Sequence, residues 1–379
     1  MTIYPICDSI YHNNQNVFTE VEKMSKLKVG IIGTGGISHC HMDGYKQLTD
    51  ILDVVAVCDI DVEKAKWYAE KYDVPRVYAD YNEMMAKEEL DCVSVCTWNS
   101  AHKGATIAAL RGGANVICEK PMAMNTEEAE EMRAVAKETG KLLQVGFVRR
   151  FGADAARMCQ LRDGGEIGDV YYAKATYLRK DGCPGGWFGD KAYSGGGPLI
   201  DLGVHVIDLA RYIAGCPKPV SAYGVTVNNL GCNRAAASES AWAGPDKKDG
   251  YEYTVEDFAT ALIRFDNGFT ISVEASFNLN IDHDCGSVEL FGTKAGVNLN
   301  NGDMYTTMAG KYTKVSTYGY QGFDFVKDFW KEIAEFVDAS QGKIPCRATA
   351  EDGVWLMKIL DAVYESARTG KSVDITPIA

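Results

Sequence analysis

The stretch "LKVGIIGTGGIS", residues 27–38, joins a short apolar run to a helical pattern through a glycine-rich turn. In a dinucleotide-binding turn, glycine permits a tight bend and lets backbone N–H groups reach a pyrophosphate at a helix N-terminus. Ser38 occupies the third motif position, where a small side chain allows close helix–strand packing. The stretch therefore predicts a Rossmann-type fold. The turn residues that we expect at the cofactor are Gly33, Gly35, Gly36 and Ile37.

Strand and helix patterns alternate from Leu27 to about Phe147, as expected for a parallel sheet covered on both faces. The second apolar run, "DVVAVCD", ends at Asp59, 26 residues after Gly33. A carboxylate at that place accepts hydrogen bonds from a ribose diol and repels a 2′-phosphate. Because the glycine turn and Asp59 occur together, we predict NAD rather than NADP. A simple glycine turn followed by a solvated aspartate is the alternative.

The second half of the chain changes pattern after about Arg150. "FATALIRFDNGFTISVEASF", residues 258–277, is typical of a β-hairpin, and further strand patterns follow it without intervening helices. We predict an α/β Rossmann domain followed by an α+β domain with an open, mainly antiparallel sheet. The expected divisions are an N-terminal arm at 1–26, the NAD-binding domain at 27–148 and a substrate-binding and oligomerisation domain at 149–379.

Charge and composition exclude several classes of function. The formal net charge of -13 argues against nucleic acid or an anionic membrane surface as a partner. No apolar run approaches the roughly 18 residues of a membrane span. The first 26 residues lack the basic and apolar regions of a signal peptide. We therefore expect a cytoplasmic protein.

The cysteine and histidine patterns do not indicate a metal site. The 12 cysteines are spread singly, several lie inside apolar runs, and no CxxC pair occurs. Such residues are mostly small buried hydrophobes in a reducing compartment. His39 and His41 are spaced as a ligand pair, but no further ligand lies near them in the sequence, so we interpret them as ordinary helix-start histidines. We predict no metal.

A second decisive stretch is "GGGPLIDLGVHVIDLARYI", residues 195–213. Leu202, Val206, Leu209 and Ile213 form the apolar stripe of a helix. Asp201 and His205 lie one turn apart beside that stripe. Asp208 follows on the same side, and with Arg211 three residues later we expect it to form a structural ion pair.

The motifs together resemble the Gfo/Idh/MocA family, named for glucose–fructose oxidoreductase and inositol dehydrogenase. The resemblance covers about 27 to 375 and rests on the glycine turn, "CTWNSAH" (96–102), "VICEKPMA" (116–123) and the stretch around Asp201 and His205. It implies an open sheet with helices on one face and a partner subunit on the other, hence a homo-oligomer. Trp98 stands where the family usually has proline, which places an indole near the nicotinamide or the substrate.

Site residues carry over at the matching motifs. The resemblance implies that Glu119 contacts the nicotinamide ribose, that Lys120 reaches the substrate, and that the Lys120–Pro121 peptide is cis. It implies that Asp201 and His205, with Lys120, are catalytic. Further cofactor contacts are expected from Thr97, Trp98, Asn99 and His102. The glycine-rich stretch 177–197 is expected to form the substrate rim with Arg179 and Trp187.

A secondary alcohol releases hydride only if its hydroxyl proton also leaves, so a base near neutral pKa and a cation for the developing alkoxide are needed. His205 is the better-matched base, and Lys120 is the second choice. Asp201 is expected to bind the substrate or to orient His205, and Lys120 to stabilise the alkoxide.

We predict an NAD-dependent dehydrogenase that oxidises a ring hydroxyl of a sugar, glycoside or cyclic polyol. Residues 182–209 most resemble glycoside 3-dehydrogenases, which implies oxidation at C3. NAD is either exchanged at each turnover or held tightly. Two alternatives stay open: a glycoside hydrolase or lyase that acts by transient C3 oxidation and elimination, and a non-catalytic NAD-binding sensor.

Overall fold

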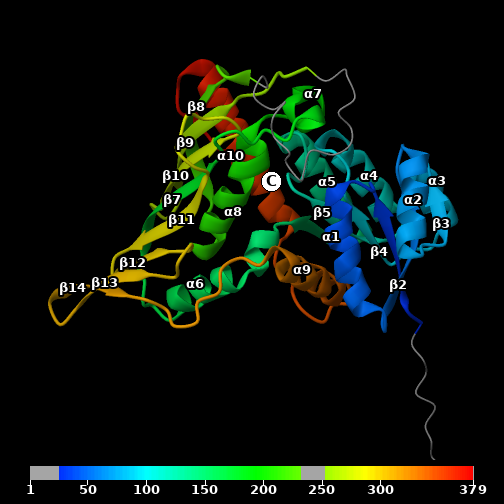
Figure 1. Ribbon diagram of the computed structural model, residues 1–379, viewed down its shortest axis with the longest axis horizontal. Coiled ribbons are helices and arrows are strands. Elements are labelled where there is room, and N and C mark those ends of the chain that lie inside the picture. Colours follow the sequence, from blue (N-terminus) through cyan, green and yellow to red (C-terminus); the bar gives the residue numbers. More distant parts are fainter. Residues whose placement is uncertain (1–24, 232–251, 379) are drawn as a thin grey trace, which may run out of the picture.

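The computed structural model describes residues 25–231 and 252–378. The arm predicted at 1–26 lies outside these residues except for its last two positions. The described chain contains two β-sheets, and several helices lie between them (Figure 1). Within the described ranges, no helix combines the length and the apolarity that a membrane span needs.

The first sheet has the strand order β3-β2-β1-β4-β5-β6, and all neighbouring strands are parallel. This is the order of a dinucleotide-binding Rossmann sheet, so the predicted fold is confirmed. Only the short strand β3 had no counterpart in the sequence pattern. The strands are β1 (Leu27–Ile32), β2 (Leu52–Cys58), β3 (Arg76–Tyr78), β4 (Cys92–Val95), β5 (Asn115–Glu119) and β6 (Leu143–Gly146).

Two of the connecting helices, α2 and α5, begin at polar side chains that cap them. Asp61 accepts a hydrogen bond from the Lys64 N–H, and Asn125 accepts one from the Glu128 N–H. The helices of this half are α1 (Gly36–Tyr45), the 3-10 turn η1 (Lys46–Leu48), α2 (Val62–Tyr72), α3 (Tyr81–Lys87), α4 (Asn99–Arg111) and α5 (Thr126–Thr139).

One helix from the far end of the chain completes the core of the first domain. α9 (Phe325–Ser340) lies against α1 (Figure 1), and its residues Ile333, Phe336 and Val337 are buried with Val29 and Met42. A Cβ atom at Gly44 of α1 would lie 2.9 Å from Ile333, so the two helices touch at a glycine. The predicted 149–379 segment therefore contributes one helix to the NAD-binding core.

The second sheet has the order β14-β13-β12-β11-β7-β10-β9-β8-β15. β7 and β10 are parallel and the other pairs are antiparallel, which confirms the mainly antiparallel prediction. The strands are β7 (Val170–Leu178), β8 (Pro219–Val227), β9 (Phe258–Phe265), β10 (Thr270–Ser276), β11 (Cys285–Gly292), β12 (Ala295–Asn298), β13 (Met304–Met308), β14 (Lys311–Val315) and β15 (Val373–Asp374).

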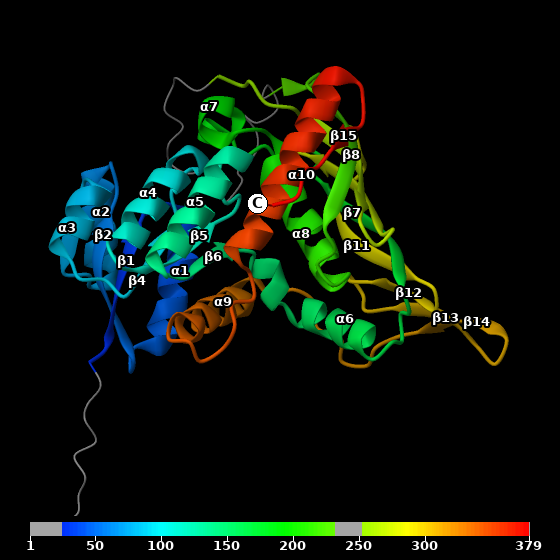
Figure 2. The same cartoon turned by 180° about the vertical axis from the view of Figure 1, so that it is seen from behind.

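The helices of the second half lie on one face of this sheet, between it and the first domain, and the opposite face carries no described helix (Figures 1 and 2). They are the 3-10 turn η2 (Val148–Phe151), α6 (Ala153–Asp163), the 3-10 turn η3 (Gly186–Gly189), α7 (Lys191–Ser194), a π-helical turn η4 (Leu199–Gly203), α8 (Val204–Ile213) and α10 (Ala350–Thr369).

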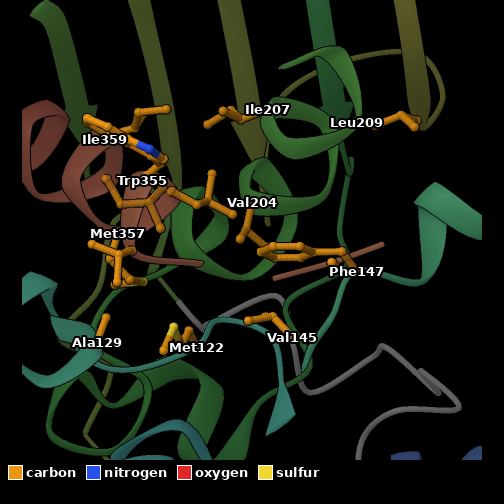
Figure 3. Packing of buried hydrophobic residues seen from close by; sticks show 14 of the residues in the cluster. Met122, Ala129, Val145, Phe147, Val204, Ile207, Leu209, Trp355, Met357 and Ile359 are labelled. Atoms are coloured by element: carbon orange, nitrogen blue, oxygen red, sulfur yellow. The ribbon is translucent and has the colours of Figure 1, made fainter. Parts of the chain in front are cut away.

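Apolar side chains join the two domains. Met122 and Val145 of the first domain lie in the same buried cluster as Val204 of α8 and Trp355 of α10 (Figure 3). A Cβ atom at Gly353 of α10 would lie only 2.5 Å from the Met122 sulfur, so α10 approaches the first domain at a glycine. The continuous core fixes α8 relative to the Rossmann sheet.

A buried charge cluster reinforces this junction. Arg150, whose side chain is 1% exposed, binds Asp208 of α8 through two nitrogens at 2.6 and 2.9 Å and Asp352 of α10 at 2.9 Å. Arg211 binds the other oxygen of Asp352 at 2.8 Å. The predicted Asp208–Arg211 ion pair was therefore wrong, because Asp208 is bound by Arg150, which the sequence places 58 positions away.

Removing the Arg150 guanidinium would leave the Asp208 carboxylate buried without its counter-charge. We expect Arg150→Met to lower the free energy of unfolding by about 3–5 kcal/mol, measured by urea titration. The control is Arg368→Met, which breaks an exposed pair with Glu365 and should change stability by less than about 1 kcal/mol. Adding Asp208→Asn to Arg150→Met should recover part of the lost stability. A loss in Arg150→Met no larger than the loss in Arg368→Met would contradict the assignment.

Candidate active site

The glycine turn after β1 is shaped to hold a dinucleotide. Gly33 has φ of 90°, and a Cβ atom there would lie 2.6 Å from the Cys96 carbonyl oxygen, so only glycine fits beside β4. Gly35 is the N-cap of α1 and no side chain caps this helix end. A Cβ atom at Gly35 would meet only the Lys64 Nζ within 4.0 Å. The start of α1 therefore has no capping side chain and has open space beside Gly35, as a pyrophosphate site requires.

Asp59 lies beside this turn at the end of β2. One carboxylate oxygen accepts from the Thr34 N–H at 2.8 Å and the Thr34 hydroxyl at 2.9 Å, and the other accepts from the Asp61 N–H at 2.9 Å. These bonds fix the orientation of the carboxylate, which is only partly buried. Each carboxylate oxygen accepts more than one hydrogen bond, so ribose hydroxyls can still bind. The site fits NAD.

The loops that follow β4 and β5 are tied together by a histidine. The two ring nitrogens of the buried His102 contact the Pro121 and Thr97 carbonyl oxygens at 2.8 and 3.1 Å. Burial lowers the pKa of His102 despite these two acceptors. A neutral ring carries one N–H and donates to one of these carbonyls at a time, and it lies between the loop of Thr97 and that of Pro121. Its place along the cofactor stays a prediction.

Contacts across the domain boundary hold the loop after β4. The buried Asn99 amide donates to the Ser194 carbonyl of α7 at 2.7 Å. The neighbouring Trp98 ring meets Tyr193 edge-on, with 5.4 Å between ring centroids. The Trp98 indole, which the family resemblance places near the nicotinamide or the substrate, thus packs against Tyr193 of α7.

Lys120 and Asp201 are brought together from different domains. Lys120 follows β5, and the Lys120–Pro121 peptide is cis, as the family resemblance implied. The Lys120 Nζ binds the Asp201 carboxylate at 2.9 Å and the Asp201 carbonyl oxygen at 3.1 Å. The two side chains are 17% and 13% exposed, so the pair is sheltered but open to a ligand.

Asp201 lies in the π-helical turn η4, whereas the sequence pattern indicated a regular helix throughout. A π-turn is common at functional sites, and here the Asp201 carbonyl is available to Lys120. The buried carboxylate of Glu256 holds the entrance to this turn by accepting from the N–H groups of Gly197 and Leu199, at 3.0 and 3.2 Å. The sequence analysis did not identify Glu256.

His205 follows in the first turn of α8. Burial is the largest cause that lowers its pKa well below 6.5, and the charges of Lys120, Arg149 and Arg179 lower it further. The imidazole is therefore neutral at physiological pH and can accept a proton. Asp201 binds Lys120 at 2.9 Å, so among its described contacts it orients the cation rather than His205.

Two predicted substrate residues have different surroundings. Arg179 lies close enough to affect the pKa of His205, and it donates to the Gly182 carbonyl at 2.9 Å. Trp187 stacks on Phe188 in η3, with 3.9 Å between ring centroids. Among the described contacts, none joins Trp187 to the catalytic residues. Its contact with the substrate stays a prediction.

The structure adds Arg149 and Tyr177 to the site. Arg149 follows β6 and its charge acts on His205, and the Tyr177 ring of β7 lies 6.5 Å from the His205 ring. The signal for Arg149 was its position just after a parallel strand, at the edge where such sheets bind ligands. Tyr177 is the first residue of the stretch 177–197 that was expected to form the substrate rim, but the sequence did not single it out, because strand pairing decides which residues of the second sheet face α8.

The chain has a Rossmann fold with an open glycine turn that suits a dinucleotide, and a lysine, a carboxylate and a neutral histidine follow it. These features together define an NAD-binding oxidoreductase. Residues 27–147 match the family "Oxidoreductase family, NAD-binding Rossmann fold", and residues 155–298 match the "GFO/IDH/MocA C-terminal domain". The chain belongs to the Gfo/Idh/MocA family. The predictions of family, fold, NAD and an oxidoreductase are confirmed.

Several relatives are similar over their whole length. The D-glucoside 3-dehydrogenase of Escherichia coli is 34% identical over 361 residues, which covers 93% of this chain and 98% of the relative. The levoglucosan dehydrogenase of Pseudarthrobacter phenanthrenivorans is 27% identical and covers 94% of this chain and 100% of its own. A solved levoglucosan dehydrogenase in complex with NADH and levoglucosan has a TM-score of 0.79 at 23% identity, covering 93% of this chain and 100% of that one.

The cations around His205 lead to a titration prediction. Lys120→Met removes a positive charge and leaves Asp201 negative nearby, so the pKa of His205 should rise toward 6.5 but stay below it, because burial remains. We expect the change in an NMR titration of the histidine Cε1–H signals, with His205→Gln used for assignment. Lys103→Met, which affects a lysine near Glu128 and Glu131 on the helix surface, is the control. A wild-type value at or above 6.5 would contradict this picture.

Proposed function

We propose that the protein oxidises a ring hydroxyl of a sugar or glucoside, at C3, to the ketone. The observation that carries this proposal is the Lys120–Asp201 ion pair of 2.9 Å beside a neutral His205, after the dinucleotide fold. The E. coli relative named D-glucoside 3-dehydrogenase supports the choice of a glucoside and of C3. The Trp98–Tyr193 pair supports a sugar, because aromatic faces suit the apolar C–H surface of the ring.

In this mechanism an unprotonated ring nitrogen of His205 accepts the substrate hydroxyl proton. The low pKa of His205 keeps that nitrogen available, and negative charge developing on the substrate oxygen offsets the nearby cations. The Lys120 Nζ stabilises the same oxygen, while the Asp201 carboxylate fixes the position of the ammonium group. NAD supplies the hydride acceptor when bound.

We propose that the chain's own residues hold that cofactor. The start of α1 would bind the pyrophosphate and Asp59 the adenosine ribose, and Glu119 would bind the nicotinamide ribose from the end of β5. Lys120 is the next residue, so the chain links the binding of the cofactor directly to the position of the cation. The location that we propose is the cytoplasm, whose reducing conditions suit the free cysteines of the described chain.

The test is a substrate panel with purified protein and NAD. It contains free hexoses, inositols and aryl O- and C-glucosides, followed by NADH absorbance and by mass spectrometry of the sugar. We expect loss of two hydrogens from a glucoside with a matching amount of NADH. His205→Ala should lower turnover about 10²–10⁴-fold and leave NADH binding nearly intact. His283→Ala, at an exposed histidine next to Asp282, is the matched control.

Other outcomes would overturn the proposal. Free aglycone without net redox change would indicate transient oxidation followed by elimination. NADH binding without turnover of any sugar would indicate a sensor. Unchanged turnover in His205→Ala would remove the assignment of His205 as the base and leave Lys120 as the candidate.

We further propose that a second copy of the chain covers the open face of the second sheet. Tyr223 of β8 and Leu262 of β9 are paired across the strands and are 47% and 46% exposed. Val225 extends this apolar patch, and the same face carries the exposed Arg264 and Glu274. A patch with charges of both signs can be self-complementary across a two-fold axis, and a second copy would remove the apolar side chains from water.

Size-exclusion chromatography with light scattering tests this assembly. The wild type should have the mass of two or more chains of 41.4 kDa each. Leu262→Glu should shift the mass toward that of one chain. The control Val326→Glu changes an exposed residue of α9, away from the open sheet face, and should keep the wild-type mass. A monomeric wild type, or an unchanged mass in Leu262→Glu, would contradict the proposed interface.

A further inference from the structure

His41, one of the two histidines at the start of α1, belongs to a buried polar chain that reaches the active site. The chain consists of Tyr45, Ser94, His41 and Glu119, and all four side chains are buried. The Tyr45 hydroxyl lies 2.8 Å from the Ser94 hydroxyl, which lies 3.0 Å from the His41 Nδ1. The His41 Nε2 lies 2.9 Å from a Glu119 carboxylate oxygen.

The direction of these hydrogen bonds follows from what each group can donate. The Glu119 carboxylate only accepts, and its second oxygen accepts from the Lys120 N–H at 3.1 Å, so the His41 Nε2 must carry a proton. With a neutral imidazole, the Ser94 hydroxyl donates to Nδ1 and the Tyr45 hydroxyl donates to the Ser94 oxygen. Every donor in the chain then points toward Glu119, and one tautomer of His41 is fixed.

The charge of Glu119 depends on this partner. Burial acts to raise the pKa of Glu119, but its interaction with His41, together with the charge of Lys120, outweighs burial and lowers it. Without His41, the same carboxyl would be buried with fewer compensating groups. Its pKa would rise, and the neutral acid would no longer be restricted to accepting hydrogen bonds.

We propose that His41 is a positioning residue, which holds the Glu119 carboxylate in one orientation so that it can bind the nicotinamide ribose and fix the backbone of Lys120. The inference rests on the proposed placement of NAD at Glu119. His41 contacts neither Lys120 Nζ nor Asp201 among the described hydrogen bonds, so its effect passes through Glu119. His39, two positions earlier, instead contacts the Tyr72 hydroxyl at 2.7 Å.

Several other titratable groups face Glu119, and none replaces His41. Glu332 of α9 is fully buried, and burial followed by the charges of Glu119 and Glu335 raises its pKa well above 4.5, so it is neutral. Burial likewise raises the pKa values of the nearby thiols, which are neutral too. The groups around the carboxylate are His41, Lys120, His102, Glu332, Cys40, Cys96 and Cys118.

The test compares His41→Leu with His41→Gln. Leucine fills the space without a donor, while the glutamine amide can place an N–H near the position of Nε2. The readout is the dissociation constant of NADH from fluorescence titration between pH 5 and 9, which needs no substrate. We expect His41→Leu to bind NADH about tenfold more weakly, with the loss of affinity on acidification moved to higher pH because the pKa of Glu119 has risen. His41→Gln should recover most of the affinity.

His39→Leu is the matched control and should keep the wild-type affinity and pH profile. An unchanged NADH affinity and acid limb in folded His41→Leu would overturn the proposal, as would a His41→Gln variant as weak as His41→Leu at unchanged melting temperature. If His41→Leu does not fold, Ser94→Ala gives the same test, because it removes the donor to Nδ1 and should weaken NADH binding about threefold. Unchanged NADH binding in Ser94→Ala would also reject the hydrogen-bond chain from Tyr45 to Glu119 as the means of positioning Glu119.

The outcomes separate this inference from the proposed function. A wild type that binds NADH but oxidises no sugar would reject the dehydrogenase proposal and leave the NADH comparison of the His41 variants decisive. Where turnover is present, His41→Leu should also lower kcat, because Lys120 is the residue after Glu119. If turnover falls in His41→Leu while the NADH affinity and its pH profile stay at wild-type values, His41 does not act through Glu119.

Discussion

Arg150 is a guanidinium almost completely removed from water, and the relative position of the two domains depends on it. It binds a carboxylate on α8 and another on α10, directly after the last strand of the Rossmann sheet. Burying such charges is unfavourable unless each is paired with good geometry. The α8 helix is therefore held in one register against the first domain, and with it the turn that carries Asp201 and His205.

The same constraint explains why Lys120 meets Asp201. Lys120 is fixed by its place after β5 and by the His102 ring, which joins the loops of Thr97 and Pro121. Asp201 is fixed by the π-helical turn that Glu256 holds at its entrance. An ion pair between two such rigid elements costs little further ordering, because neither side chain comes from a mobile segment. The Lys120 ammonium is consequently held in one position.

Charges at the site divide into two groups with different environments. Around α8, burial and three cations keep His205 neutral, which suits a proton acceptor. Behind β5, a buried histidine compensates the carboxylate of Glu119. Lys120 belongs to both groups, since its backbone N–H binds Glu119 and its ammonium binds Asp201. The position of the cation is thus coupled to the cofactor side of the site as well as to the substrate side.

The sequence by itself determined the Rossmann domain, the NAD preference and the candidates Lys120, Asp201 and His205. Those features depend on local rules: glycine at a tight turn, an acid at a strand end, and residues one helical turn apart. Only the tertiary structure decided that Asp208 pairs with Arg150, that α9 completes the first core, and that Arg149, Glu256 and His41 support the site. These contacts join residues far apart in the chain, and no periodicity or spacing specifies which distant groups burial will bring together.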